Sequence, residues 1–265
     1  MNPWDIYASK IGAHGYSKRD IVKNREIRFL HDKLKSSLSY HKVTIGSDPR
    51  ELAIINSDNL NIKTICTLPG EDIHCGTFVE WADNVWLITT KDANNELYTK
   101  GTMQQCNHLL RWVANGNEII ERWCIVEDGT KYLTGEYNDN NYVVTRGDSR
   151  ISITLPRDEY TIQLNRDSRF LIDDPETNDV LAYRLTKPFR LGWTFNGEGV
   201  MVFVLTECNT EDTDNFDLRI ANYYDYFPRD DDSGSPDSST GSSTGTSTEG
   251  TIKEQGNSTG KKVWL

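Results

Sequence analysis

The residues with the clearest capacity for chemistry are cysteines and histidines, because thiolates and imidazoles bind zinc. The candidates are Cys66, His74, Cys75, Cys106, His108 and Cys124. A structural zinc site normally has two close ligand pairs of the CxxC or HxxxH type, whereas this set offers only an adjacent His-Cys pair and a Cys-x-His pair. Buried free thiols and ordinary strand histidines explain these residues better, and we expect no bound metal.

Other signatures of catalysis are equally weak. The sequence has no Walker GxxxxGKS/T loop, no dinucleotide-binding glycine fingerprint and no HExxH motif. Gly147-Asp148-Ser149 lies between two expected strands and lacks the second glycine of a nucleophile elbow, which is typical of a hairpin turn. The carboxylates between Asp173 and Asp179 do not have the spacing of an EF-hand calcium loop. We therefore expect a protein that is not an enzyme and needs no cofactor.

The composition is that of an acidic protein with enough apolar material for a core. Its 265 residues carry a formal charge of −11, and 36% of them are hydrophobic. Nucleic-acid binding usually needs clustered Lys and Arg, so the charge disfavours specific DNA binding. No stretch approaches the roughly 20 apolar residues of a membrane helix, and the five cysteines do not indicate a disulfide framework. We expect folding in a reducing cytoplasm and no association with membranes.

One helix is predicted near the N-terminus, over Lys18–Lys35. Ser17 and Asp20 have the spacing of a capping box, the run contains no Pro or Gly, and it ends with basic residues, as the helix dipole favours. Arg25 and Arg28 on this helix are candidates for contact with an acidic partner or nucleic acid, although a solvated helix face is their more ordinary role.

Beyond Tyr40 the pattern changes to short strands separated by Gly, Asp, Asn and Pro. Segments 78–81 and 85–89 read as an antiparallel hairpin, as do 109–113 and 118–125. This spacing suits barrels or sandwiches and argues against a doubly wound α/β enzyme.

A Thr-Leu-Pro motif occurs twice, at residues 67–69 and 154–156, and each copy is followed by two further strand-like runs. The repeat predicts a duplicated small barrel. The expected fold is therefore mainly β, with one N-terminal helix followed by two small antiparallel β-barrel or sandwich-like units and then a disordered-looking C-terminal tail. The expected segments are 1–40 (arm and helix), 41–125 (first barrel), 126–227 (second barrel) and 228–265 (a Ser/Thr/Gly-rich linker with an apolar C-terminal anchor).

Aromatic and apolar residues flank the two expected barrels and are candidates for contacts between subunits, because aromatic side chains are enriched at protein interfaces. Together with Arg25 and Arg28, the candidate interaction residues are Trp4, Ile6, Tyr7, Tyr223, Tyr224, Tyr226, Phe227, Val263, Trp264 and Leu265. The last three end a long polar tether, which would let them dock on a neighbouring subunit.

Several of these segments resemble the neck proteins of tailed bacteriophages, which are called head-closure, stopper or head-tail connector proteins. The resemblance lies in Trp4-Asp5-Ile6-Tyr7, Arg28-Phe29-Leu30, residues 54–60, the run from Val79 to Thr89, and residues 106–112. It implies a small β-barrel protein that assembles in the host cytoplasm into a ring of the virion. The ring, commonly of six or twelve copies, would join the portal or an adaptor to the tail and help to retain or gate the genome. Packaged DNA would pass through its lumen without sequence-specific binding.

Two other classes of function stay open at the level of the sequence. A different tail or tail-tip structural protein, or a glycan-binding adhesin, would use the exposed aromatics and β-loops to bind its target. A hydrolase or a zinc enzyme would contain metal or turn over a substrate.

Overall fold

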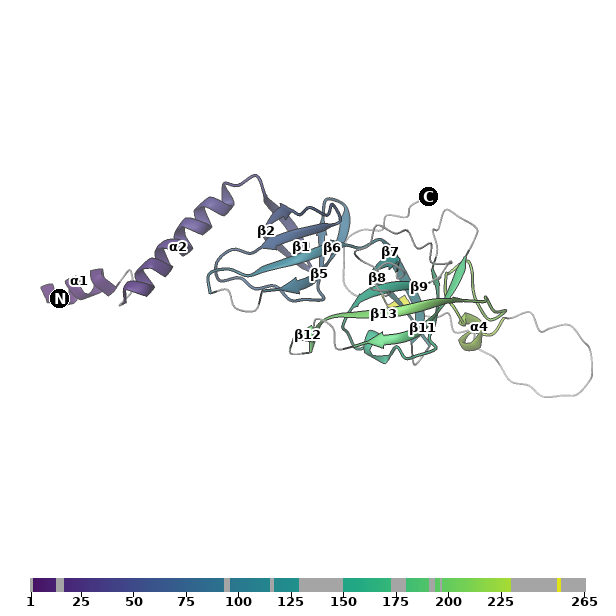
Figure 1. The fold of residues 1–265 in the computed structure, drawn as a ribbon. Helices are drawn as coiled ribbons and strands as arrows, with labels where there is room; N and C mark the ends of the chain where they lie inside the picture. The colour runs from purple at the N-terminus through teal and green to yellow at the C-terminus, as the bar shows by residue number, and fades with distance from the viewer. Residues whose placement is uncertain are drawn as a thin grey trace, which may run out of the picture. The chain divides into compact units, whose positions relative to one another are not determined.

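The fold is mainly β, with helices at the N-terminus (Figure 1). The computed structural model describes residues 2–12, 17–92, 96–114, 117–128, 150–172, 180–190, 194–195, 197–229 and 252–253. The chain divides into two compact units, which are Met1–Cys106 with Trp193–Val200, and Asn107–Gly192 with Met201–Leu265.

Two helices begin the first unit, α1 (Pro3–Gly12) and α2 (Lys18–Lys35). The predicted capping box is confirmed, because the Asp20 N–H donates to Ser17 Oγ at 3.1 Å and the Ser17 N–H donates to Asp20 Oδ2 at 3.2 Å. Each bond satisfies an amide that the helix itself leaves without a partner. Among the described residues, no helix is long and apolar enough to cross a membrane.

Six strands of the first unit form a closed antiparallel barrel in the order β1-β2-β3-β6-β5-β4, with β4 beside β1. These strands are β1 (Tyr40–Ile45), β2 (Asp48–Asn56), β3 (Ile62–Cys66), β4 (Phe78–Trp81), β5 (Asn84–Lys91) and β6 (Lys100–Gln105). The predicted hairpin of β4 and β5 is confirmed, and its turn residues Ala82 and Asp83 have φ values of 53° and 60°. Closure leaves the barrel without the unpaired edges of an open sheet.

Alternate strand residues fill the interior of this barrel. Leu52, Ile65, Val79, Ile88 and Met103 are all buried there, and they come from five of the six strands. The barrel core is therefore made by side chains that lie far apart in the sequence.

Among the described residues, the second unit contains six main strands, one short strand and a short helix. The main strands are β7 (His108–Ala114), β8 (Glu118–Asp128), β9 (Arg150–Pro156), β10 (Arg169–Ile172), β11 (Leu181–Phe189) and β13 (Glu198–Cys208). The remaining elements of this unit are the 3₁₀ turn Thr161–Gln163, α4 (Tyr223–Tyr226), and β14 (Ile252–Lys253), which pairs in parallel with β8. The short strand β12 (Thr194–Phe195) pairs with the first two residues of β13, and this hairpin belongs to the first unit.

The pairing order of the second unit, β7-β8-β9-β13-β11-β10, repeats the order of the first barrel. At the closing position β7 lies against β10, where the rings of Trp112 and Phe170 meet edge to face at 6.3 Å. Both units also have a register shift at the same place, after Ile88 in β5 and after Leu185 in β11, each the fifth residue of its strand. A shared β-bulge of this kind marks a repeated structural design. The predicted duplication is confirmed at the level of strand order.

The boundary between the units differs from the predicted one. They divide at Cys106 and Asn107, not at 125 and 126. The predicted boundary would cut through β8, whose first part pairs with β7 and whose last four residues pair with β9. Hairpin signals along the sequence identify neighbouring strands but not the sheet that contains them.

One buried ion pair ties the end of the second unit to its sheet. Arg169 donates to both carboxylate oxygens of Asp214, at 3.0 and 2.9 Å, and the two side chains are only 4% and 0% exposed. The same guanidinium donates to Asn222 Oδ1 at 2.6 Å and to the carbonyl oxygen of Asn209 at 2.9 Å. A single arginine therefore fixes the segment from 209 to 222.

Removing one partner of this pair should be strongly destabilising. We expect Asp214→Ala to lower the free energy of unfolding by about 3–5 kcal/mol, because it removes the buried counter-ion of Arg169 and leaves the buried guanidinium with the half-exposed carboxylate of Glu211 at 3.2 Å. Urea unfolding followed by circular dichroism measures the loss. Arg184→Ala, at an exposed position of β11, is the control and should change stability by no more than about 0.5 kcal/mol. An unchanged unfolding midpoint for Asp214→Ala would contradict the structure.

Alanine substitutions at two glycines of the first unit distinguish the cost of backbone strain from the cost of a steric clash. A Cβ at Gly76 (φ +83°) would collide with the carbonyl oxygen of Gly199, whereas a Cβ at Gly70 (φ +88°) would have no atom within 4 Å. We expect Gly70→Ala to cost about 1–2 kcal/mol through its left-handed backbone alone. Gly76→Ala should cost clearly more in the same unfolding assay, because Gly199 must also move. Equal losses would show that the contact is absent.

Candidate assembly surface

The first helix presents aromatic side chains to solvent. Trp4 and Tyr7 are 72% and 59% exposed, and their rings touch edge to face at 6.1 Å between centroids. Ile6 between them is also exposed. Aromatic side chains are enriched at protein interfaces, where they contribute much of the binding free energy. The structure therefore brings Trp4 and Tyr7 together on α1, which also carries the exposed Ile6.

The second helix buries none of its residues. Ile21, Val22 and Phe29 are 45%, 43% and 52% exposed, and the Lys33 ammonium lies 4.9 Å from the centre of the Phe29 ring. A helix of a globular protein normally packs its apolar stripe against the core, which is the main source of helical stability. Among the residues that the structure describes, no such packing buries a residue of α2. We call α1 and α2 together, residues 3–35, the N-terminal arm.

The charge of α2 is opposite to that of the rest of the protein. Seven Lys and Arg against three Asp and Glu give the helix a formal charge of +4, so the remainder of the chain must carry −15 to reach the total of −11. The candidates Arg25 and Arg28 both lie on this helix and are exposed, and Arg25 contacts the neighbouring Glu26 at 3.4 Å. The helix is thus suited to an acidic surface.

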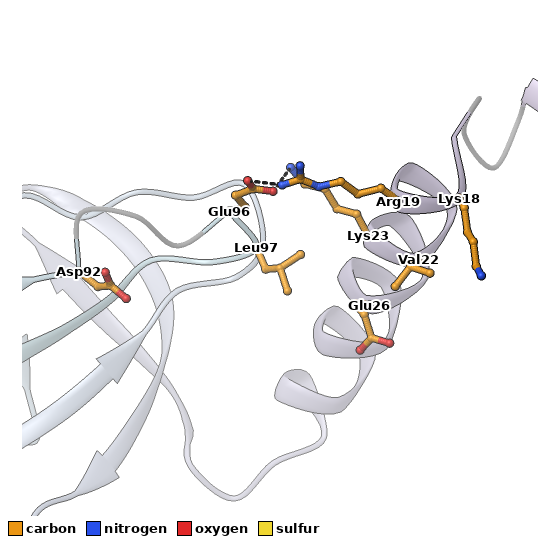
Figure 2. A pocket seen from close by; sticks show the side chains of 8 residues that line it. All are labelled: Lys18, Arg19, Val22, Lys23, Glu26, Asp92, Glu96 and Leu97. Atoms are coloured by element: carbon orange, nitrogen blue, oxygen red, sulfur yellow. Dashed lines mark hydrogen bonds and ion pairs between the residues drawn. The ribbon is translucent and has the colours of Figure 1, made fainter.

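Figure 2 shows where α2 meets the barrel of its own unit. Arg19 Nη2 and Lys23 Nζ lie 2.7 and 3.6 Å from the carboxylate of Glu96, which follows β5. The hydrogen bond from Arg19 holds the pKa of the Glu96 carboxyl below its usual value. Below the ion pairs, Val22 and Leu97 line an open hollow of about 710 Å³ (Figure 2). The ion pairs to Glu96 span this hollow, but it stays open to solvent.

A short connection joins the arm to the barrel. The Ser37 N–H donates to the carbonyl oxygen of Leu34 and the Tyr40 N–H to that of Ser37, so the helix passes into β1 through a single turn. Leu38 within this turn is 99% exposed. The arm is therefore attached at one end, through a segment that contributes nothing to the core.

The aromatic cluster before the tail belongs to the second unit rather than to an arm. The Tyr223 ring lies 5.3 Å from Tyr224 and 4.8 Å from Phe227, and the Arg229 guanidinium lies 4.0 Å from the Tyr224 ring. Of the four predicted residues only Tyr226, at 43%, is exposed. The remaining candidates, Val263, Trp264 and Leu265, lie outside the described residues.

The cysteines and histidines considered for zinc are not gathered into one place. Among the described residues no three His, Cys, Asp or Glu side chains are placed to hold a metal ion. His74 Nδ1 lies 2.7 Å from Glu198 Oε2, a partner that the sequence gave no means of finding. Cys66, Cys75 and Cys106 are buried, and burial raises the pKa of their thiols, to about 12 for Cys106.

Thiol reactivity should follow this burial. At pH 8 we expect iodoacetamide to modify the half-exposed Cys208 much faster than Cys106, because the thiolate is the reacting form. Peptide mass spectrometry before and after unfolding measures the difference.

The raised pKa of Cys106 also means that the folded protein holds this thiol proton more tightly than the unfolded chain does, so the free energy of unfolding should fall as the pH rises from about 9 toward 12. Rapid native labelling of Cys106 would contradict its burial.

Comparison with models of protein families gave a match over the first unit. Residues 16–105 match the model of the family described as the YomX N-terminal domain, which is phage-derived. The matched range contains α2 and all six strands of the first barrel, and it ends one residue before the unit boundary at Cys106. Searches of curated proteins and of solved structures gave no match. Over the helix and barrel of its first unit, the chain is therefore similar to a phage family, which indicates a phage-associated protein.

Proposed function

We propose that this protein is a structural component of a tailed-phage particle, located in the neck. Copies of the chain form a ring that joins the DNA-filled head to the tail and helps to retain or gate the genome. The N-terminal arm makes the contacts that hold the ring together. The role is mechanical, without catalysis or a bound cofactor.

The observation that carries this proposal is the arm. Its second helix is 18 residues long and capped at its start, yet it buries no residue within the chain. Burying a fully exposed valine or phenylalanine side chain contributes about 1.5–3 kcal/mol, and since Val22 and Phe29 are 43% and 52% exposed, covering them would contribute roughly half of that each. Apolar surface of this kind in a phage-associated protein supports a role in assembly.

The two units fit the same role. Each contains six main strands paired in the same order, and such a sheet is a rigid support for contacts at the surface. The acidic remainder of the chain, at −15, binds phosphate poorly. A ring through which DNA moves benefits from weak contacts with the phosphates, because strong ones would retard the DNA.

Removal of the arm should prevent assembly without unfolding the barrels. We expect the full chain to form a ring, alone or on a portal or tail protein, and a variant lacking residues 1–36 to remain a single copy under the same conditions. Mass photometry and negative-stain imaging measure both states. The variant should keep its thermal unfolding midpoint, because α2 contributes no buried residue to the barrel core.

The opposite result is equally informative. A full chain that stays a monomer and binds neither portal nor tail protein would overturn the neck role. Glycan binding by that monomer would then support the adhesin alternative.

A further inference from the structure

We propose that α2 of one copy docks on the acidic site beside β5 of a second copy, so that each subunit of the assembly holds the arm of its neighbour. The site consists of Asp92, Glu96 and Leu97. This inference rests on the proposed function, since it names the partner surface of the arm within the ring.

The contact within one chain is too small to hold the helix. The Arg19 and Glu96 side chains are 77% and 57% exposed, and an ion pair so exposed contributes little to stability because water and salt screen it. Val22 remains 43% exposed even though it faces Leu97 across the hollow. The recognition elements, two cations and an apolar residue opposite a carboxylate and a leucine, are present, but the surfaces are not closed on each other.

Charge distinguishes between the possible partners of the helix. Two copies of α2 would bring +4 against +4, which disfavours a bundle of arms. The same helix meets a neighbouring copy whose remaining residues carry −15. Long-range attraction between these parts steers the helix of one copy to the body of the next. A second copy of this chain is therefore the partner whose charge fits best.

Because the arm is joined to the barrel by one turn, α2 can be exchanged between copies at a small cost in free energy. The turn from Ser36 to Ser39 is the only covalent link between α2 and β1, and no residue of α2 belongs to the barrel core. A rotation in this turn can replace the contact with Glu96 of the same chain by the identical contact with Glu96 of a neighbour.

Complementary charge reversal tests this contact between copies. One variant carries Arg19→Glu with Lys23→Glu, and the other carries Glu96→Arg. We expect each variant alone to need at least about tenfold more protein to assemble, which corresponds to about 1.4 kcal/mol per contact. An equal mixture of the two should assemble like the wild type, because the reversed helix of one matches the reversed site of the other, and the native helix matches the native site.

Controls with matched charge changes lie on the second unit. Arg184→Glu with Lys187→Glu, both exposed in β11, and Glu207→Lys at an exposed position of β13 repeat the charge changes away from the site. These variants should assemble like the wild type. Circular dichroism and thermal unfolding establish that every variant is folded before its mass distribution is measured.

Three outcomes would overturn the inference. They are unchanged assembly of the single variants, failure of the mixture to recover, and a wild type that never self-associates. If rings form on the portal but the charge variants behave like the wild type, the neck function stands and the docking site is wrong. If the mixture recovers self-association but no copy binds portal or tail protein, the docking site stands and the neck function is wrong.

Discussion

The structure depends on the crossover that follows the third strand of each unit, because it brings the fourth strand beside the first. In the first unit this turn is held by the buried Thr67, whose hydroxyl donates to the carbonyl oxygen of Glu71 and accepts from the Thr99 N–H, both at 3.0 Å. In the second unit the buried Thr161 donates to the Pro156 carbonyl oxygen at 2.8 Å. Buried polar groups are tolerated only when they are paired, so each threonine favours a single path for the crossover.

An arginine from the second strand supports each of these turns. Arg50 donates to the carbonyl oxygen of Asp72 at 2.8 Å, and Arg122 donates to the carboxylate of Asp158 at 2.7 Å. The two units thus share strand order, a bulge and an arginine contact to the loop after the third strand. Repetition of these contacts indicates that the duplication extends from topology to the interactions that specify it.

Buried and exposed apolar side chains are divided between different parts of the chain. The barrels bury their apolar side chains and contain the paired charges, whereas the arm keeps apolar and basic side chains in solvent. The basic segment thus lies on a separate element from the acidic remainder of the chain.

The sequence by itself determined the features that depend on neighbouring residues. The capping box and the absence of Pro and Gly specified α2, and alternation with turn residues specified the β4–β5 hairpin. The repeated Thr-Leu-Pro motif indicated the duplication. These signals act within a few residues, where the backbone hydrogen bonds are local.

Only the tertiary structure decided which strands share a sheet. Pairs such as β3 with β6 join distant segments, and they form because closure buries both sets of interior side chains. The same long-range packing set the boundary at Cys106, placed Tyr223 against Phe227, and paired Arg169 with Asp214. Within the described part of the chain it also left α2 without a buried residue, which no local sequence pattern predicts, because burial depends on the packing of distant segments.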